Sequence, residues 1–491
     1  MKRTSLSHPL QIAEVEVAPG FGRIGVTFCP GKTDAKAMTG AWERDLTLDL
    51  ERVAQWGAAA VVTLVEQHEL ELLQVPGLGK VVEARHMLWW HLPIPDVSTP
   101  GPTFERGWVT AGPALRAMLR DGASVLVHCR GGLGRAGMIA ARLLIELRDD
   151  ARKAISKVRK VRPGAIETAA QEKHLIALGR AAEADPDCSV EACRDRAVGA
   201  FLGLAVGDAI GTTLEFKPRD DSAQRLTDMA GGGPFRLDLG QWTDDTSMAL
   251  ALADSLHVHP HLEPSDLMER FVAWWKQGTY SCTGQCFDIG NTTRDALQRW
   301  LRTGDPLAGS AAAHTAGNGS LMRLAPAAIR HWNNAEARDA VAIFQSRTTH
   351  GAEEAIDACR LYADLIAEAI AGQPRYMILA PRAFKGSAKI EAIANGAWRT
   401  KPRIAIRGSG YVVDALEAAL WCIGRTADFP SAVLMAANLR DDADTTAAIT
   451  GQLAGALYGA SGIPREWLDR LAWHPRIKGM AQGLFEASLT G

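Results

Sequence analysis

The chain has 491 residues, of which 47% are hydrophobic and 22% are charged, and its formal net charge is -2. This length exceeds what one hydrophobic core supports, so we expect two or three domains. The small net charge gives no reason to expect a nucleic acid or an anionic membrane as a partner. No apolar run reaches roughly 18 residues, and no apolar segment follows the basic N-terminus, so we expect a cytoplasmic protein.

The cysteines argue against a disulfide framework and against a structural zinc site. There are eight, and none forms a C-x2-C pair. The wider pairs, Cys188 with Cys193 and Cys282 with Cys286, are interpreted as structural.

The two halves of the chain differ in their pattern of apolar residues. Up to about residue 180, short β-branched runs at 24–28, 59–65 and 123–129 alternate with helical segments, which predicts an α/β domain with a mainly parallel sheet. The basic stretch at 152–163 is predicted to be a solvated helix end. From Val198 onward, alanine-rich segments with helical spacing dominate, which predicts an all-α domain. We therefore predict domains at 1–185 and 195–491, joined by a linker at 186–194.

The stretch VLVHCRGGLGRAG at 125–137 allows two interpretations. Its three glycines spell G-x-G-x-x-G, the turn that binds a dinucleotide between a strand and a helix. Such a site also needs an acidic residue roughly 20 residues later, to hold the ribose hydroxyls. That region reads ARKAISKVRK, which is basic and helical, so the dinucleotide interpretation is disfavoured.

The second interpretation is a phosphate-binding loop that carries a nucleophile. Backbone N–H groups at a helix N-terminus form an anion site, and glycines allow a ligand to approach them closely. Arg135 can bind phosphate oxygens with both arms of its guanidinium group. Cys129 would then be a thiolate, because helix N-termini can lower a thiol pKa to roughly 3.5–7.5. The residues expected to cradle the phosphate are Arg130, Gly131, Gly132, Leu133 and Gly134.

Residues 20–175 resemble the cysteine-dependent dual-specificity phosphatases, especially the cyclin-dependent kinase-associated phosphatase group, through HCRGGLGR and through FCPG, WERDL and DLERVAQWGAAAVVTL upstream. The resemblance implies that Asp96, in HLPIPD, is the general acid and that Gln171 orients the hydrolytic water. The family usually has Ser or Thr after the arginine, where this chain has Ala136. Slow hydrolysis of the phosphoenzyme is therefore expected.

Two acidic clusters, QWTDDTS at 241–247 and RDDADTT at 440–446, precede helical runs in the second half. Either cluster alone is typical of a helix N-cap, in which the side chain accepts a backbone hydrogen bond. If the clusters meet, their carboxylates require a cation, and an all-oxygen ligand shell suits Mg²⁺ or Mn²⁺. Paired cations at such a site would favour a hydrolytic reaction.

Residues 195–491 resemble the ADP-ribosylglycohydrolase family, particularly its dinitrogenase reductase-activating branch, through AFLGLAVGDAIGTTLEF, QWTDDTSMALALA, YSCTGQCFDIGNTTRDAL, GNGSLMRLAP, SGYVVDALEAALW and DDADTTAAITGQLAGALYG. The resemblance implies a helical bundle around a two-metal site, with Asp288 as acid/base and Glu215 as a second candidate for that role. The implied metal ligands are Thr243, Asp244, Asp245, Asp442, Asp444 and Thr445. Candidate substrate contacts are Asn318, Gly319, Ser409, Gly410 and Tyr411. Tyr411 would either stack on adenine or be an aromatic residue of the core, and His350 is interpreted as structural.

Together the two resemblances imply a bifunctional hydrolase. The second domain would release ADP-ribose from arginine side chains of an ADP-ribosylated protein, or act on another ADP-ribose derivative, with Mg²⁺ or Mn²⁺ as cofactor. The first domain would hydrolyse phosphomonoesters without a metal, on a substrate that stays open. The alternative is a phosphatase-like domain that binds phosphate for targeting without efficient turnover, which Ala136 makes conceivable.

Overall fold

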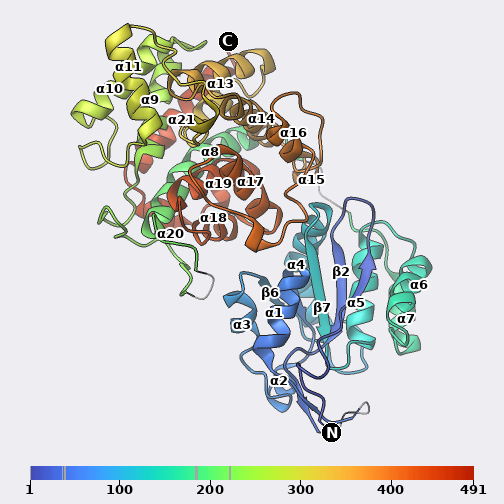
Figure 1. The fold of residues 1–491 in the computed structure, drawn as a ribbon. Coiled ribbons are helices and arrows are strands. Elements are labelled where there is room, and N and C mark those ends of the chain that lie inside the picture. Colours follow the sequence, from blue (N-terminus) through green and yellow to red (C-terminus); the bar gives the residue numbers. More distant parts are fainter. Residues whose placement is uncertain (1, 36, 38–39, 183–185, 221–222, 491) are drawn as a thin grey trace. The chain divides into compact units, whose positions relative to one another are not determined.

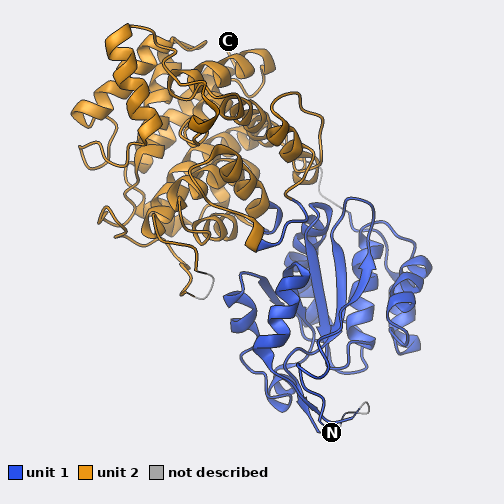
Figure 2. Cartoon of the chain, in the orientation of Figure 1, with its two compact units in different colours: residues 1–184, 399–403, 424–427 blue, residues 185–398, 404–423, 428–491 orange. Residues whose placement is uncertain are grey.

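The computed structural model describes residues 2–35, 37, 40–182, 186–220 and 223–490. The chain divides into two compact units (Figures 1 and 2). The first unit contains residues 1–184 with the short segments 399–403 and 424–427, and the second unit contains the rest of the chain. The expected domain end at residue 185 lies outside the described residues.

Part of the expected linker at 186–194 is helical instead. Helix α8 (Val190–Gly211) begins after Ser189, whose hydroxyl accepts a hydrogen bond from the backbone N–H of Ala192 at 3.2 Å. A serine N-cap satisfies a free N–H group of the first turn and so allows the helix to start before the apolar motif.

The first unit is built on a five-stranded sheet in the order β1-β2-β7-β5-β6. Its strands are β1 (Ala13–Glu16), β2 (Arg23–Phe28), β5 (Ala58–Thr63), β6 (Leu88–His91) and β7 (Ser124–Cys129). Only β1 is antiparallel to its neighbour. The three predicted strand runs are confirmed as β2, β5 and β7, which are the buried centre of the sheet. The two edge strands, β1 and β6, have only four residues each, too few for a clear pattern.

Helices cover this sheet, and a small ribbon of β3 (Thr33–Asp34) and β4 (Trp42–Glu43) lies apart from it. Helix α5 packs against β2 and β7 and is buried along its whole length. The basic segment forms the amphipathic helix α6, which buries only Ala154, Ile155 and Val158 and leaves most of its basic residues toward solvent, as predicted. The helices are α1 (Leu46–Trp56), α2 (Gln67–Leu72), α3 (Leu78–Ala84), α4 (Pro102–Arg120), α5 (Gly134–Glu146), α6 (Ala151–Val161) and α7 (Ala169–Ala177).

The second unit is helical, and its described residues contain isolated β-bridges but no strand, which confirms the predicted all-α class. Besides α8, its helices are α9 (Asp244–Val258), α10 (Pro264–Gln277), α11 (Asn291–Thr303), α12 (Ala325–Arg330), α13 (Ala335–Thr349), α14 (Glu353–Ile370), α15 (Arg375–Ile378), α16 (Ala388–Ala394), α17 (Val412–Gly424), α18 (Phe429–Ala437), α19 (Ala443–Tyr458), α20 (Arg465–Arg470) and α21 (His474–Ser488). Short 3₁₀ turns connect several of them.

Helices α8 and α19 run antiparallel in close contact at the centre of this unit (Figure 1). A Cβ atom on Gly203 would lie 2.2 Å from the carbonyl oxygen of Gly451, and one on Gly207 would lie 2.2 Å from that of Ala447. Only glycine allows backbones to approach so closely. The end of α8 therefore meets the start of α19, which matters for the site below.

Helix α8 is also the one described helix with the length and apolar composition of a membrane span. However, 94% of its most apolar window is buried inside the unit. These are the properties of a core helix.

Candidate active sites

The phosphate-type loop connects the end of β7 to the start of α5. Cys129 is the last residue of β7 and is almost fully buried, and its Sγ accepts a hydrogen bond from the N–H of Gly132 at 3.2 Å. Gly132 has a φ of +70°, and a Cβ atom there would lie 2.4 Å from the backbone carbon of Thr27. A glycine is therefore required for the loop to fold over the thiol.

Arg135 is buried at the base of this loop. Its two Nη atoms donate to the carboxylate of Glu69 at 2.6 and 2.9 Å, and Nη1 also donates to the carbonyl of Ile94 at 3.0 Å. Nη2 lies 2.9 Å from Oδ1 of Asp96, whose side chain is 60% exposed. The structure thus brings Cys129, Arg135 and Asp96 together, as predicted from motifs separated by about 30 residues.

Glu69 is a site residue that the motifs did not reveal. A buried guanidinium needs an anionic partner, and Glu69 supplies one in a two-point contact. Burial opposes ionisation of this carboxyl, but the hydrogen bonds from Arg135 and from the backbone of Glu66 outweigh it, so its pKa is lowered. Glu69 therefore fixes the orientation of the arginine.

Other residues of the loop have structural partners. The Arg130 side chain forms an ion pair with Asp34 at 3.0 Å, so only its backbone belongs to the cradle. Arg162 donates to the carbonyls of Gly131 and Gly132 at 3.2 and 3.0 Å. These hydrogen bonds hold the two carbonyls of the loop, and they too were not predicted.

Two further predicted positions of the first unit are buried beside the loop. Gln171 donates to the carbonyl of Ser98 and accepts from the N–H of Glu167, so its amide ties the segment of Asp96 to the segment before α7. Ala136 is fully buried in the first turn of α5, directly after Arg135.

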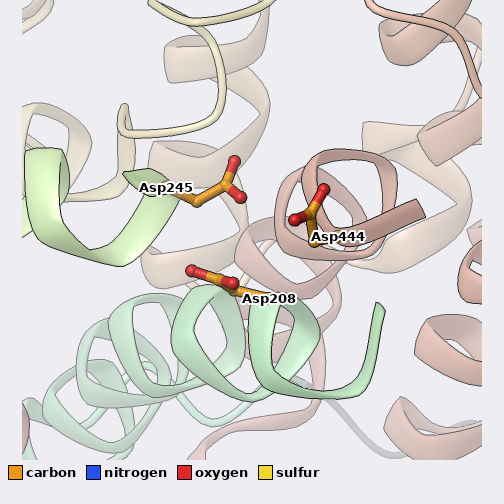
Figure 3. Close-up of side chains that lie close together, drawn as sticks. All are labelled: Asp208, Asp245 and Asp444. Atoms are coloured by element: carbon orange, nitrogen blue, oxygen red, sulfur yellow. The ribbon is translucent and has the colours of Figure 1, made fainter. Parts of the chain in front are cut away.

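The carboxylates of the second unit converge from three helices. Asp208 lies near the end of α8, Asp245 in the first turn of α9 and Asp444 in the first turn of α19, and one oxygen of each lies within 4.8 Å of the others (Figure 3). All three residues are buried. Asp208 was not predicted, although the GDAIG segment that contains it was noted.

The N-cap alternative does not explain these clusters. Thr243 and Asp442 are the N-cap residues of α9 and α19, but neither side chain makes a capping hydrogen bond. The hydroxyl of Thr243 instead lies 2.9 Å from Asp208, 3.1 Å from Asp245 and 3.3 Å from Asp444. The cluster is therefore organised around its own oxygens.

A second group joins Glu215, Asp442 and Asp444, again with one oxygen of each within 4.8 Å of the others. Glu215 accepts from the N–H groups of Ala443 and Asp444 at 2.6 and 3.3 Å, so it caps α19 from a distant segment. The two groups share Asp444, and together they offer two adjacent positions for cations.

Burial dominates the electrostatics of this cluster. It raises the pKa of Asp208 and of Asp442 to about 7, with Asp444 adding to the effect. The pKa values of Asp244, Asp245 and Glu215 are also raised, by burial first and by neighbouring carboxylates. So many buried acids repel one another unless a positive charge joins them.

The donor set fits a hard divalent cation. Oδ1 of Asp245 is buried and has no hydrogen-bond partner among the described residues. A buried carboxylate oxygen without a hydrogen-bond partner destabilises the folded state unless a ligand binds to it. The surrounding groups are carboxylates and hydroxyls, with no thiol or imidazole in either group of three. Oxygen-only shells of this kind are typical of Mg²⁺ and Mn²⁺.

A cleft of about 670 Å³ opens above the cluster. This volume lies within the range of small-molecule sites, about 300–1,000 Å³. Of the predicted residues, those that line it are Glu215, Asp244, Asp288, Asn318, Gly319, Gly410, Asp442 and Thr445. Asp288 is partly buried, and burial together with Asp244 raises its pKa to about 11.

Two predicted substrate contacts do not line the cleft. Ser409 donates to Asp414 at 2.8 Å. The Tyr411 hydroxyl donates to Glu354 and accepts from Lys389, whose Nζ also lies 5.0 Å from the centre of the tyrosine ring. With its polar end and one ring face so occupied, the predicted stacking on adenine gains no support.

His350, interpreted above as structural, does line the cleft. Its Nδ1 lies 2.8 Å from the hydroxyl of Thr349, which also accepts from the buried Arg323. Either the Thr349 hydroxyl or His350 Nδ1 can carry the proton of this contact, because a hydroxyl both donates and accepts. Burial lowers the pKa of His350 to about 3, so the ring is neutral.

Comparisons with known proteins divide the chain in the same way. Residues 189–490 match the ADP-ribosylglycohydrolase family, and residues 37–175 match a family described as Swiss Army Knife protein, DSP-PTPase phosphatase domain. A Pseudomonas putida (strain GB-1) protein named ADP-ribosylarginine hydrolase Tri1 is 49% identical over 296 residues, which cover 60% of this chain and 79% of that protein.

Two more comparisons extend this picture. A solved structure described as an ADP-ribosylglycohydrolase-related protein complex has a TM-score of 0.55 and 40% identity, and the match covers 61% of this chain and 99% of that one. Cyclin-dependent kinase inhibitor 3 of Rattus norvegicus is 34% identical over 137 residues, which cover 27% of this chain and 62% of that protein. The first unit thus spans less than two thirds of this relative.

Proposed function

The chain belongs to the ADP-ribosylglycohydrolase family, and its glycohydrolase domain is fused to a dual-specificity-phosphatase-like domain. From this premise we propose that the second unit hydrolyses the bond between ADP-ribose and an arginine side chain of a protein. The observation that carries the proposal is the set of buried carboxylates beneath a cleft of about 670 Å³. The arginine acceptor is supported by the 49% identity to a protein named ADP-ribosylarginine hydrolase.

The residues proposed to hold a pair of divalent cations are Thr243, Asp244, Asp245, Asp442, Asp444 and Thr445, together with Asp208. When bound, such cations would orient ribose hydroxyls and make water a better nucleophile. Glu215 lies within the same oxygen shell, and its hydrogen bonds to α19 hold the start of that helix in place.

Asp288 is the proposed acid/base. It lines the cleft, and in the cation-free site it retains its proton at neutral pH. Positive charge nearby would ease the release of this proton, which suits a group that exchanges protons with the attacking water and the leaving nitrogen. Asn318 donates to Asp442 at 2.6 Å and so fixes one wall of the cleft.

The test is the release of ADP-ribose from a mono-ADP-ribosyl-arginine protein. We expect release with Mg²⁺ or Mn²⁺ and none after removal of metal with EDTA. Release that persists after complete removal of divalent cations would contradict the proposed site. Failure with both metals would contradict the activity itself.

For the first unit we propose hydrolysis of phosphomonoesters. Cys129 would attack phosphorus, Arg135 would bind the phosphate oxygens and Asp96 would protonate the leaving oxygen. The supporting observation is that these three side chains meet at one loop, with Asp96 2.9 Å from the guanidinium of Arg135. Phosphate release from p-nitrophenyl phosphate tests this proposal, and the absence of turnover alongside measurable phosphate binding would favour the targeting alternative.

A further inference from the structure

Three phenylalanine rings form an aromatic trio at the helical unit's cleft. The rings of Phe216 and Phe235 lie 5.9 Å apart edge to face, and those of Phe235 and Phe287 lie 5.3 Å apart. Phe216 is 64% exposed, and the other two are partly buried. Among the described residues, none of the three is packed into the hydrophobic core of the unit. Core packing therefore does not account for them.

Two rings of the trio are adjacent in sequence to the candidate catalytic residues. Phe216 directly follows Glu215, and Phe287 directly precedes Asp288. Phe216 and Phe235 both line the cleft, as do the two acidic residues. The rings thus stand beside the carboxylates at which the scissile bond is expected.

The backbone holds this arrangement in an unfavourable conformation. Phe216 has a φ of 57° and Asp288 a φ of 60°, which side chains larger than glycine rarely adopt. The N–H of Phe216 donates to the carbonyl of Asp441 at 2.8 Å, which fixes the turn. As a result the Glu215 carboxylate accepts a hydrogen bond at the start of α19, while the ring of Phe216, the next residue, lines the cleft. Strain of this kind is retained where the surroundings determine the position of a side chain.

The ring faces of the trio suit a planar cation, because aromatic faces attract guanidinium groups. The one arginine that lines the cleft, Arg294, donates to Asn291 and to the carbonyl of Ile289 and forms no ion pair in the described structure. Arg294 is therefore the suitable partner for an anionic diphosphate, whereas the trio is suited to a planar cation with an apolar stem.

We infer that the aromatic trio binds the guanidinium group and adjoining methylenes of the acceptor arginine, on the far side of the scissile bond from the ADP-ribose. This inference rests on the proposed hydrolase function and deepens it. The trio then selects arginine-linked substrates over substrates with small neutral acceptors, without taking part in the bond cleavage.

The test separates the acceptor from the ADP-ribose. The variants Phe216→Leu and Phe235→Leu are measured for kcat and KM on an ADP-ribosyl-arginine peptide, and for inhibition by free ADP-ribose, which lacks the acceptor. We expect KM to rise about 2- to 30-fold, the range of a cation–π contact, with an unchanged inhibition constant. Phe216→Tyr retains the ring and is expected to keep the KM of the wild type.

Phe344→Leu provides the matched control, because this exposed ring lies on α13 and does not line the cleft. An unchanged KM in both leucine variants would overturn the inference, as would a parallel loss of ADP-ribose inhibition, which would place the rings on the adenine. If one leucine variant fails to fold, as judged from its unfolding temperature, Phe287→Leu replaces it. A wild-type protein without hydrolase activity would instead refute the proposed function itself.

Discussion

The two candidate sites are built in opposite ways. The nucleophile and the arginine of the first unit lie six residues apart in one loop, whereas the carboxylates of the second unit come from segments as far apart as residues 208 and 444. The first site neutralises its buried charge internally, by pairing Arg135 with Glu69. The second site accumulates carboxyl groups that must either retain protons or be balanced by an added cation. A local loop can therefore be complete by itself, whereas a distributed acidic site depends on both packing and a ligand.

The sharpest separation of the two sites is expected from Cys129→Ser. The variant should lower phosphatase activity at least about 1,000-fold, because the hydroxyl is a far weaker nucleophile than the thiolate. ADP-ribose release should be unchanged, and both rates are measured on the same preparation. Cys188→Ser serves as the control, since that thiol is exposed and far from the loop in sequence. A phosphatase rate that survives Cys129→Ser would rule out the cysteine mechanism.

Asp444→Asn tests the distributed site in the same manner. Asp444 belongs to both groups of carboxylates, so we expect ADP-ribose release to fall by more than about 100-fold, beyond the loss typical of outer-shell changes. Circular dichroism should show an intact fold, because the change removes a buried charge and leaves the volume the same. Asp441→Asn is the matched control, an exposed carboxylate three residues away. Full activity of Asp444→Asn would refute the assigned site.

Glu69→Gln tests whether the first site is balanced internally. Breaking a buried ion pair on one side typically costs about 3–5 kcal/mol, so urea unfolding at pH 7 should reveal a clear loss of stability. The Glu69 pKa is lowered by folding, so its contribution is present above the ordinary value of 4.5 and is lost as pH falls below it. The difference in the free energy of unfolding between the variant and the wild type should therefore be smaller near pH 3 than at pH 7. A difference that stays constant with pH would show that the pair is not responsible.

Ala136→Ser addresses the departure of the first unit from its family. The added hydroxyl lies at the start of α5 next to the loop, where it can stabilise the departing thiolate. A hydrogen bond to a charged group supports roughly a 10-fold faster breakdown of the phosphoenzyme. Pre-steady-state release of p-nitrophenol from p-nitrophenyl phosphate, which precedes breakdown of the phosphoenzyme, should show a burst in the wild type that diminishes in the variant. Equal bursts in both proteins would show that the missing hydroxyl is not limiting.

The smallest expected effect is the stabilisation of the second unit by metal. A cation at 100 times its Kd adds about 2.7 kcal/mol, which raises the unfolding temperature by several degrees. Asp208 and Asp442 have pKa values of about 7 when cation-free, so protons compete with the cation below that pH. The temperature shift caused by Mn²⁺ should be larger at pH 8 than at pH 6. Thermal scans at the two pH values, with EDTA as the reference, measure it, and a larger shift at pH 6 would contradict the argument.

The sequence by itself determined the two fold classes, because the periodicities of apolar residues differ between strands and helices and are written locally in the chain. It also predicted the loop around Cys129, since all its parts lie within one turn. Asp444 and Asp245 were predicted from short motifs whose acidic residues start helices. These predictions share one property, which is that neighbours in sequence carry the whole signal.

Tertiary structure decided what distant residues do. Asp208 became part of the cluster because glycines let α8 approach α19 closely, and Glu69 became the partner of Arg135 because the chain places α2 beside the loop. His350 lines the cleft, whereas Tyr411 is engaged by Glu354 and Lys389. Burial and partnership depend on packing between segments, and no local pattern encodes them.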